Sequence, residues 1–93
     1  MQLVTIAIVA DRDPEKESHR ATDAALQHAA GTLGVSLVAE WIATEAVPTD
    51  DAVGLLAPFD AVFLGPGAPY RSADGAFAAV RFAREQGWPF FGT

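Results

Sequence analysis

The chain has 93 residues, enough for one small domain at most, and its 51% hydrophobic and 19% charged residues are typical of a globular protein rather than a disordered one. Twelve acidic residues against six basic ones give a net charge of −6, and the basic residues are scattered, which argues against a nucleic-acid partner. The absence of cysteine excludes disulfides, thiolate metal sites and a thiol nucleophile within these residues, and no apolar run approaches the roughly 18 residues of a membrane span.

The first predicted element is a strand over residues 3–9, a short apolar run of the kind buried on both faces of a parallel sheet. No basic stretch precedes this run, so we expect an opening strand and not a signal peptide, and a cytoplasmic location. A helix follows, because apolar residues recur at helical spacing up to Gly34. Asp13 is its expected N-cap and Pro14 its first residue.

The alternation of strands and helices continues to the last residues. A second strand is expected over residues 35–42, then a polar connection with one helical turn around residues 51–56, then a third strand over residues 60–65. Ser72 is the expected N-cap of the next helix and Gly87 its C-terminal stop, with a fourth strand over residues 88–92. Because parallel neighbours need helical crossovers, the sequence predicts an α/β protein with a parallel, doubly wound sheet flanked by helices.

Two segments at the carboxyl ends of these strands carry functional information, since ligands bind there in such sheets. In LGPGAPYRSADG, the backbone N–H of Gly67 can point at developing negative charge, as an oxyanion hole requires. The alternative is that Gly and Pro only make a strand-to-helix turn. In the final FFGT, Gly92 and Thr93 fit the first two positions of a nucleophile elbow, whose nucleophile would be the next residue.

The stretch FDAVFLGPGAPYRSADGAFAAVRFAREQGWPFFGT resembles class I glutamine amidotransferase domains of the CTP synthase type. In that family a strand ends in Pro-Gly-Gly, an Arg follows, an acidic residue and Gly open a helix that closes on Ala-Arg-Glu, and an apolar strand leads into Gly-x-Cys. The residues that fit are Asp60, Pro66, Gly67, Arg71, Asp74, Gly75, Ala83, Arg84, Glu85, Pro89 and Gly92. The chain is more similar still to bacterial proteins related to the CTP synthase C-terminal region, some of which are selenoproteins.

The resemblance implies a flavodoxin-like α/β fold in which residues 1–93 are the N-terminal portion of one amidotransferase-like domain. It implies that Gly67 is the oxyanion-hole and glutamine-contact position and that Ala68 stands where the family has a second glycine. It also places Tyr70 and Arg71 beside the glutamine pocket.

The same resemblance places the family's catalytic nucleophile, and the His and Glu of its triad, after Thr93, so no catalytic residue is expected within the chain. Because the chain ends just before the expected nucleophile, we expect that residue to be a selenocysteine encoded by TGA, with a boundary chosen by an experimenter as the alternative. A selenol ionises more readily than a thiol and would need less help from a neighbouring base.

Other reactive side chains are expected to have ordinary roles. His19 and His28 point in nearly opposite directions on one helix, so each is predicted to be a surface or packing histidine and not a metal ligand. For Asp11 and Asp13, a solvated loop that caps the first helix is favoured over a site for a cation or an amine. Core positions are favoured over ligand stacking for the aromatic residues Trp41, Trp88, Phe90 and Phe91.

Two functions of different class remain open. In the first, the chain is the N-terminal part of a CTP synthase-like glutamine amidotransferase that hydrolyses the glutamine amide and donates ammonia; it carries the oxyanion-hole loop without the nucleophile, and is inactive alone. In the second, it is a non-catalytic flavodoxin-like module that binds a small acid or a protein partner. We expect L-glutamine or a related small molecule as ligand, no cofactor and no metal, and self-association or a dimer through apolar faces around the last strand.

Overall fold

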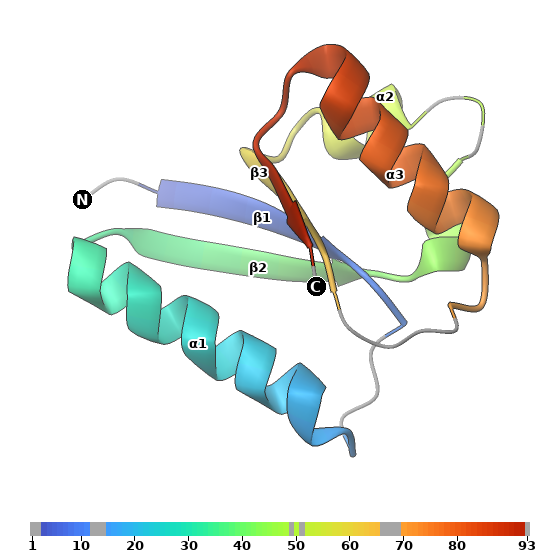
Figure 1. Cartoon of the computed structure of the whole chain (residues 1–93). Helices are drawn as coiled ribbons and strands as arrows, with labels where there is room; N and C mark the ends of the chain where they lie inside the picture. Colours follow the sequence, from blue (N-terminus) through green and yellow to red (C-terminus); the bar gives the residue numbers. More distant parts are fainter. Residues whose placement is uncertain (1–2, 12–14, 49, 51, 66–69, 93) are drawn as a thin grey trace.

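Strands and helices alternate along the chain as the sequence predicts. The computed structural model describes residues 3–11, 15–48, 50, 52–65 and 70–92. In chain order the elements are β1 (Leu3–Val9), α1 (Glu17–Leu33), β2 (Ser36–Ile42), the 3₁₀ turn η1 (Thr44–Ala46), α2 (Val53–Leu56), β3 (Ala61–Leu64), α3 (Ala73–Gln86) and β4 (Phe90–Gly92) (Figure 1). The short turn η1 is not predicted by the sequence pattern and replaces part of the polar connection.

All strands lie in one four-stranded parallel sheet with the order β2-β1-β3-β4. After β1 the chain passes through α1 to β2 at one edge, then returns past β1 to β3 and passes through α3 to β4 at the other edge. The strand order therefore reverses between β1 and β3. In open parallel sheets, such a switch point creates a crevice at the carboxyl ends of the strands. The parallel, flavodoxin-like α/β fold is confirmed.

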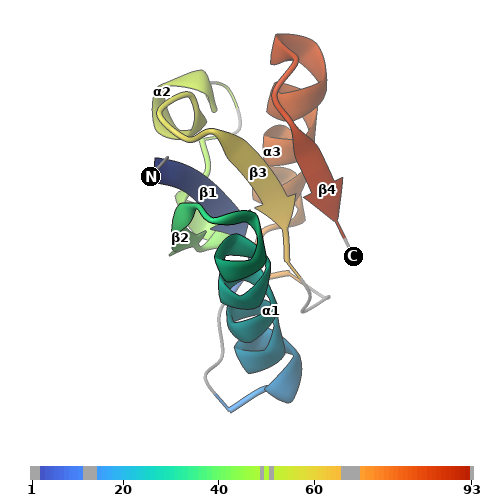
Figure 2. The same ribbon diagram turned by 90° about the vertical axis from the view of Figure 1, so that its left-hand side faces the viewer.

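Helices cover both faces of this sheet, with α1 on one face and α2 and α3 on the other (Figure 2). Alternate side chains of β1 divide between the two cores: Ile6 and Ile8 pack with Leu26 of α1, whereas Ala7 and Val9 lie in the core that contains Phe82 of α3. Residues 6–10 are buried, as expected for a central strand, but Leu3 is exposed. Alanines on the helices allow a close approach to the sheet.

Both predicted ends of α3 are confirmed. The Ser72 side-chain oxygen accepts a hydrogen bond from the Gly75 backbone N–H at 3.0 Å, which satisfies one of the free donors of the first turn. Gly87 has a left-handed φ of 73°, and the next N–H, that of Trp88, donates to the Ala83 carbonyl at 3.0 Å. Because Trp88 belongs to this helix cap, β4 begins later than predicted, at Phe90.

The predicted start of α1 is wrong. The helix begins at Glu17, and the residue in the N-cap position is Lys16, which makes no side-chain cap. Asp13 and Pro14, the predicted cap and first helical residue, lie outside the described residues. The first fully buried side chain of the helix is His19, whose ring packs against Trp41 of β2, so the helix begins close to its first described contact with the sheet. Within the described residues, no helix has the length and apolarity needed to cross a membrane.

Candidate functional site at the carboxyl edge of the sheet

The segments that follow β1, β2 and β3 meet at the carboxyl edge of the sheet. Asp11 follows β1, Thr44 opens η1 directly after β2, and residues 70–72 lead into α3. These segments are far apart in the sequence and are brought together because their strands are neighbours in the order β2-β1-β3. Figure 1 shows η1 beside the first turn of α3.

The Asp11 carboxylate joins all three segments. One of its oxygens, Oδ1, accepts from the Thr44 backbone N–H at 3.0 Å, and the other, Oδ2, accepts from the Arg71 backbone N–H at 2.7 Å. The Thr44 hydroxyl lies within 3.1 Å of both oxygens. The carboxylate therefore holds two loops by charge-assisted hydrogen bonds, which are stronger than neutral ones.

Thr44 extends this network to the start of α3. Its side chain is completely buried, and its hydroxyl oxygen accepts a hydrogen bond from the Ser72 backbone N–H at 2.9 Å while the hydroxyl proton is donated to Asp11. Ser72 in turn caps α3. A chain of hydrogen bonds thus connects Asp11, through Thr44, to the N-terminus of α3. We call Asp11, Thr44, Arg71 and Ser72 the Asp11 network.

Gly75 allows the first turn of α3 to pack against the backbone of Thr44, a residue of this network. A Cβ atom at this position would lie 1.9 Å from the Thr44 carbonyl oxygen and 2.9 Å from its carbonyl carbon, closer than atoms can approach. The obstacle is backbone, which cannot rotate away as a side chain could. The glycine of the pattern at Asp74 and Gly75 therefore has a steric cause in this structure.

A hydrogen bond outside the Asp11 network fixes Gly65, the residue that follows β3. The Tyr70 hydroxyl donates to the Gly65 carbonyl oxygen at 2.7 Å, which connects the two ends of the loop between β3 and α3. Gly65 itself packs closely on β1: a Cβ atom there would lie 2.9 Å from the Ala10 Cβ and 3.1 Å from the Ile8 Cγ2. The residues of this loop between the two ends lie outside the described residues.

The electrostatics of the network follow from its hydrogen bonds. Burial opposes ionisation of Asp11, but the hydrogen bonds from the Arg71 and Thr44 N–H groups and from the Thr44 hydroxyl outweigh it and lower the pKa of this carboxyl below its usual value. The pKa of Tyr70 is raised, first by burial and then by the negative charge of Asp11. At neutral pH, Asp11 is therefore an anion and Tyr70 a neutral hydrogen-bond donor.

A cleft of about 230 Å³ opens beside the network and is lined by Ala10, Asp11, Trp41, Ala43 and Arg71. Trp41 forms one wall. Its ring is fixed by a hydrogen bond from the indole N–H to the Asp23 Oδ1 at 2.7 Å and by contact with the buried His19 ring, whose centroid lies 5.1 Å away. The cleft combines an apolar wall with two residues of the Asp11 network, Asp11 and Arg71.

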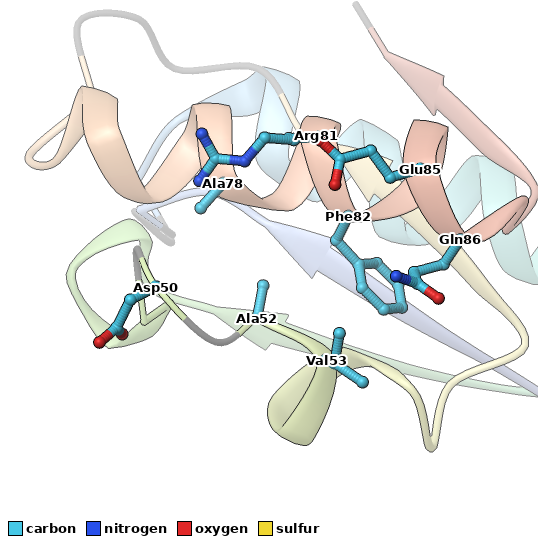
Figure 3. A pocket seen from close by; sticks show the side chains of 8 residues that line it. All are labelled: Asp50, Ala52, Val53, Ala78, Arg81, Phe82, Glu85 and Gln86. Carbon is cyan, nitrogen blue, oxygen red and sulfur yellow. The ribbon is translucent and has the colours of Figure 1, made fainter.

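A second, smaller hollow of about 120 Å³ lies between α2 and α3 (Figure 3). Phe82 points from α3 toward Val53 and Ala52, and the charged side chains of Arg81 and Glu85 lie along the helix at the rim. None of the predicted site residues lines this hollow.

The chain matches CTP synthases along nearly its whole length. It is 36% identical over 89 residues to the CTP synthase of Parasynechococcus marenigrum (strain WH8102) and 35% identical over 89 residues to that of Nitrobacter winogradskyi, in each case over 96% of the chain and 16% of the relative. The match to the CTP synthase of Pelotomaculum thermopropionicum is 34% over 90 residues. The chain is similar in sequence to one part of the CTP synthases. It spans about one sixth of their length, and no protein-family model matches it.

The predicted site residues of the chain fall into three groups. Tyr70 and Arg71 lie at the carboxyl edge of the sheet. Tyr70 binds the Gly65 carbonyl after β3, and Arg71 belongs to the Asp11 network. Gly67, Ala68 and Thr93 lie outside the described residues. Gly92 is the last residue of β4, and its backbone pairs with that of Leu64 on the neighbouring strand β3.

Sequence reasoning misses the central residue of the site. The prediction that Asp11 belongs to a solvated loop capping the first helix is wrong, because its carboxylate binds Thr44 and Arg71 instead. Its position directly after a buried strand is the available signal. No sequence pattern marks Thr44 as a site residue, because its hydrogen-bond partners Asp11 and Ser72 belong to two segments that are distant in the sequence.

The remaining predictions concern the histidines and the aromatic residues. His19 is buried by packing against Trp41, and His28 is exposed, so both have the ordinary roles expected of them. Trp88 packs on Phe82 with ring centroids 5.3 Å apart, as a core residue. Phe90 is 40% exposed, which contradicts a core position for it and follows from its place on an edge strand. Among the described residues, no three carboxylate or imidazole groups cluster as a metal site would require.

Proposed function

We propose that this chain forms the oxyanion side of the glutamine site in a CTP synthase-like class I glutamine amidotransferase. The observation that carries the proposal is the identity of 34–36% to CTP synthases over nearly all of the chain. The position of the Asp11 network at the switch point of the sheet supports it, since ligands bind there in α/β sheets of this type.

In the proposed reaction, a nucleophile from outside residues 1–93 attacks the side-chain amide carbon of glutamine. The Gly67 backbone N–H stabilises the oxyanion that forms, and the intermediate collapses with release of ammonia. In this proposal, Ala68 stands where the family has a second glycine. The acyl group is then released by water. The chain's own contribution is the position of this N–H, which depends on how both ends of the loop are held.

The Asp11 network is well suited to that task. It fixes the backbone N–H groups of Arg71 and Ser72 directly after the loop, and the Tyr70 hydroxyl fixes Gly65 directly before it. A hydrogen-bond donor aimed at an oxyanion is effective only when its position is set in advance. We propose that Tyr70 and Arg71 also contact the bound substrate.

The test compares the isolated chain with the gene product that contains it. The 93-residue chain should release no ammonia from glutamine, because it has no thiol nucleophile. In the gene product, Gly67→Pro removes the N–H and should lower kcat by about 100-fold or more, whereas Gly67→Ala keeps the N–H and is the matched control. Circular dichroism of both variants separates misfolding from lost catalysis. Glutamine hydrolysis by the isolated chain would overturn the proposal.

An inactive gene product that still binds small acids would favour the alternative, a non-catalytic flavodoxin-like module. Two further predictions belong with the proposal. A cytoplasmic location is expected for an enzyme of nucleotide metabolism, and selenocysteine after Thr93 stays a prediction that the genomic sequence following codon 93 decides.

A further inference from the structure

The strand β2 forms one edge of the sheet. It is the outermost strand in the order β2-β1-β3-β4, and each of its residues from Ser36 to Ile42 pairs with β1 on the inner side. We propose that the outer side of β2 binds an extended, basic segment of a partner protein, which joins the sheet as a further antiparallel strand. The inference is independent of the proposed function, because it uses no residue of the Asp11 network.

The backbone groups of a strand point alternately to one side and to the other. The Ile42 carbonyl accepts a hydrogen bond from the Ala10 N–H at 3.0 Å, so Ile42 faces the strand β1. By the alternation, Val38 also faces β1, and the N–H and C=O groups of Leu37 and Ala39 point outward. An antiparallel strand beside β2 can therefore exchange two hydrogen bonds with Ala39.

This edge has few of the features that keep free strands from pairing. The segment SLVAEWI contains no proline, glycine or lysine, and its unbroken register with β1 leaves no bulge. The side-chain amide of Gln27 on α1 donates to the Leu37 carbonyl at 3.2 Å, which also confirms that this carbonyl points outward. Gln27 is exposed, so its amide can give way to the N–H of an incoming strand.

The side chains of β2 favour an apolar, β-branched partner strand. Leu37, Ala39 and Trp41 pack against the same core beneath α1, and because they alternate along one face, the small Ala39 lies between two large residues. An aliphatic side chain opposite Ala39 can pack between them. On the other face, Val38 is 53% exposed and offers apolar contact to a cross-strand neighbour.

The charge around β2 favours a basic partner. Residues 21–70 contain six acidic residues and no lysine or arginine, so the whole net charge of −6 comes from this part of the chain. Glu40 lies on β2 within it and is exposed. A lysine opposite Glu40 would form a cross-strand ion pair. A second copy of the chain would instead bring two negatively charged surfaces together, which favours a different, basic protein as the partner.

The probe is a peptide, blocked at both ends, with the sequence threonine-threonine-lysine-isoleucine-valine-threonine-lysine. Antiparallel to β2, it places its first lysine opposite Glu40, its isoleucine opposite Ala39 and its valine opposite Val38. Binding to the 93-residue chain is followed by NMR at pH 7. Amide hydrogen exchange of Leu37 and Ala39 should slow as the peptide binds, whereas that of Val38 should change little because its N–H already faces β1.

Two altered peptides test the backbone pairing and the charge on the unmodified chain. N-methylation of the isoleucine removes the N–H that donates to the Ala39 carbonyl and should weaken binding about 10-fold or more. Replacing both lysines by glutamates should weaken binding to a similar extent, because it places a negative charge opposite Glu40.

Two substitutions in β2 locate the site. Glu40→Gln should weaken binding of the lysine peptide about 2–5-fold. Glu85→Gln is the matched control and should leave binding unchanged, because it neutralises an exposed carboxylate on α3. Ala39→Pro removes an outward N–H and no bond to β1, and should prevent the slowing of exchange at Leu37. If that variant fails to fold, the N-methylated peptide still tests the pairing.

Three results would overturn the inference. The first is unchanged exchange at Leu37 and Ala39 with the lysine peptide at about 5 mM. The second is equal affinity for the lysine peptide and either altered peptide. The third is slow exchange at these two amides that increases with chain concentration when no peptide is present, since a second copy of the chain would then occupy the edge.

Discussion

The Asp11 carboxylate accepts a hydrogen bond of 2.7 Å from the backbone N–H of Arg71, sixty residues further along the chain. This bond joins the end of β1 to the entry of α3 across the switch point of the sheet. A polar contact between segments so distant in sequence fixes the edge of the sheet where the functional residues gather. Its removal should therefore affect both stability and the pH dependence of folding.

Asp11→Asn should lower the free energy of unfolding at pH 7 by about 1–3 kcal/mol, because an amide cannot accept from all of the N–H and O–H donors that face it. The pKa of Asp11 is lowered in the folded state, so its contribution is complete above the unfolded value of about 3.9 and is lost as the pH falls through the folded value. Urea denaturation at pH 7 and at pH 3 measures both effects.

In that experiment the difference between the unmodified chain and Asp11→Asn should narrow toward pH 3. Asp50→Asn, an exposed aspartate with no place in the network, should change stability by no more than about 0.5 kcal/mol. A difference that stays constant between the two pH values would show that the charge of Asp11 has no part in folding.

Thr44→Val should destabilise the chain by about 1–3 kcal/mol, because the half-buried Ser72 N–H and the Asp11 carboxylate both lose their hydrogen bond to the hydroxyl. Thr44→Ser keeps the hydroxyl and should cost about 0.8 kcal/mol for the lost methyl group. Amide hydrogen exchange of Ser72, followed by NMR, should accelerate in the valine variant and not in the serine variant. Equal exchange in both would mean that the hydroxyl does not hold this N–H.

Gly75→Ala should destabilise the chain by about 3 kcal/mol or more, because the new Cβ would overlap the Thr44 backbone carbonyl and α3 would have to move. Gly31→Ala is the matched control. It is also helical, but beyond its chain neighbours and its own helix backbone no atom lies within 4 Å of the added Cβ, so it should raise stability by about 0.5–1 kcal/mol. Thermal unfolding of the two variants should give shifts of opposite sign, and shifts of the same sign would contradict the close contact at Gly75.

Tyr70 can be titrated without interference, since it is the single tyrosine of the chain. The ultraviolet absorbance of its phenolate should appear above the usual pKa of about 10, and Asp11→Asn should move the transition to lower pH because the nearby negative charge is gone. Stability from the Tyr70 hydroxyl is complete below about pH 10 and is lost as the pH rises through the folded value. A transition unchanged by Asp11→Asn would contradict this coupling.

Self-association stays a prediction with a structural basis in the edge strand β4, where Phe90 is 40% exposed. Light scattering of the 93-residue chain should give a mass above that of the monomer, and Phe90→Lys should lower it, because a charged residue on an edge strand opposes pairing. Phe77→Lys changes another exposed aromatic residue, on α3, and should leave the mass unchanged. A monomer at all concentrations would reject the prediction.

Local sequence patterns determined the elements and most of their ends. The apolar run of β1, the serine at the start of α3 and the glycine at its end act over a few residues, so their effect can be predicted from the sequence alone. The same locality explains the error at α1: an Asp-Pro pair is a favourable local start for a helix, but α1 begins at Glu17, next to the buried His19 that packs it on the sheet. The similarity to CTP synthases, too, was visible in the sequence.

The tertiary structure alone decided which loops meet. Nothing near Asp11 in the sequence indicates that its partners are Thr44 and Arg71, because these become neighbours only when β2 and β3 take their places on either side of β1. The need for glycine at position 75 has the same origin, since the atom that excludes a side chain belongs to η1. Hydrogen bonds and steric contacts between distant segments depend on strand order, and strand order is set by the packing of the whole sheet against its helices.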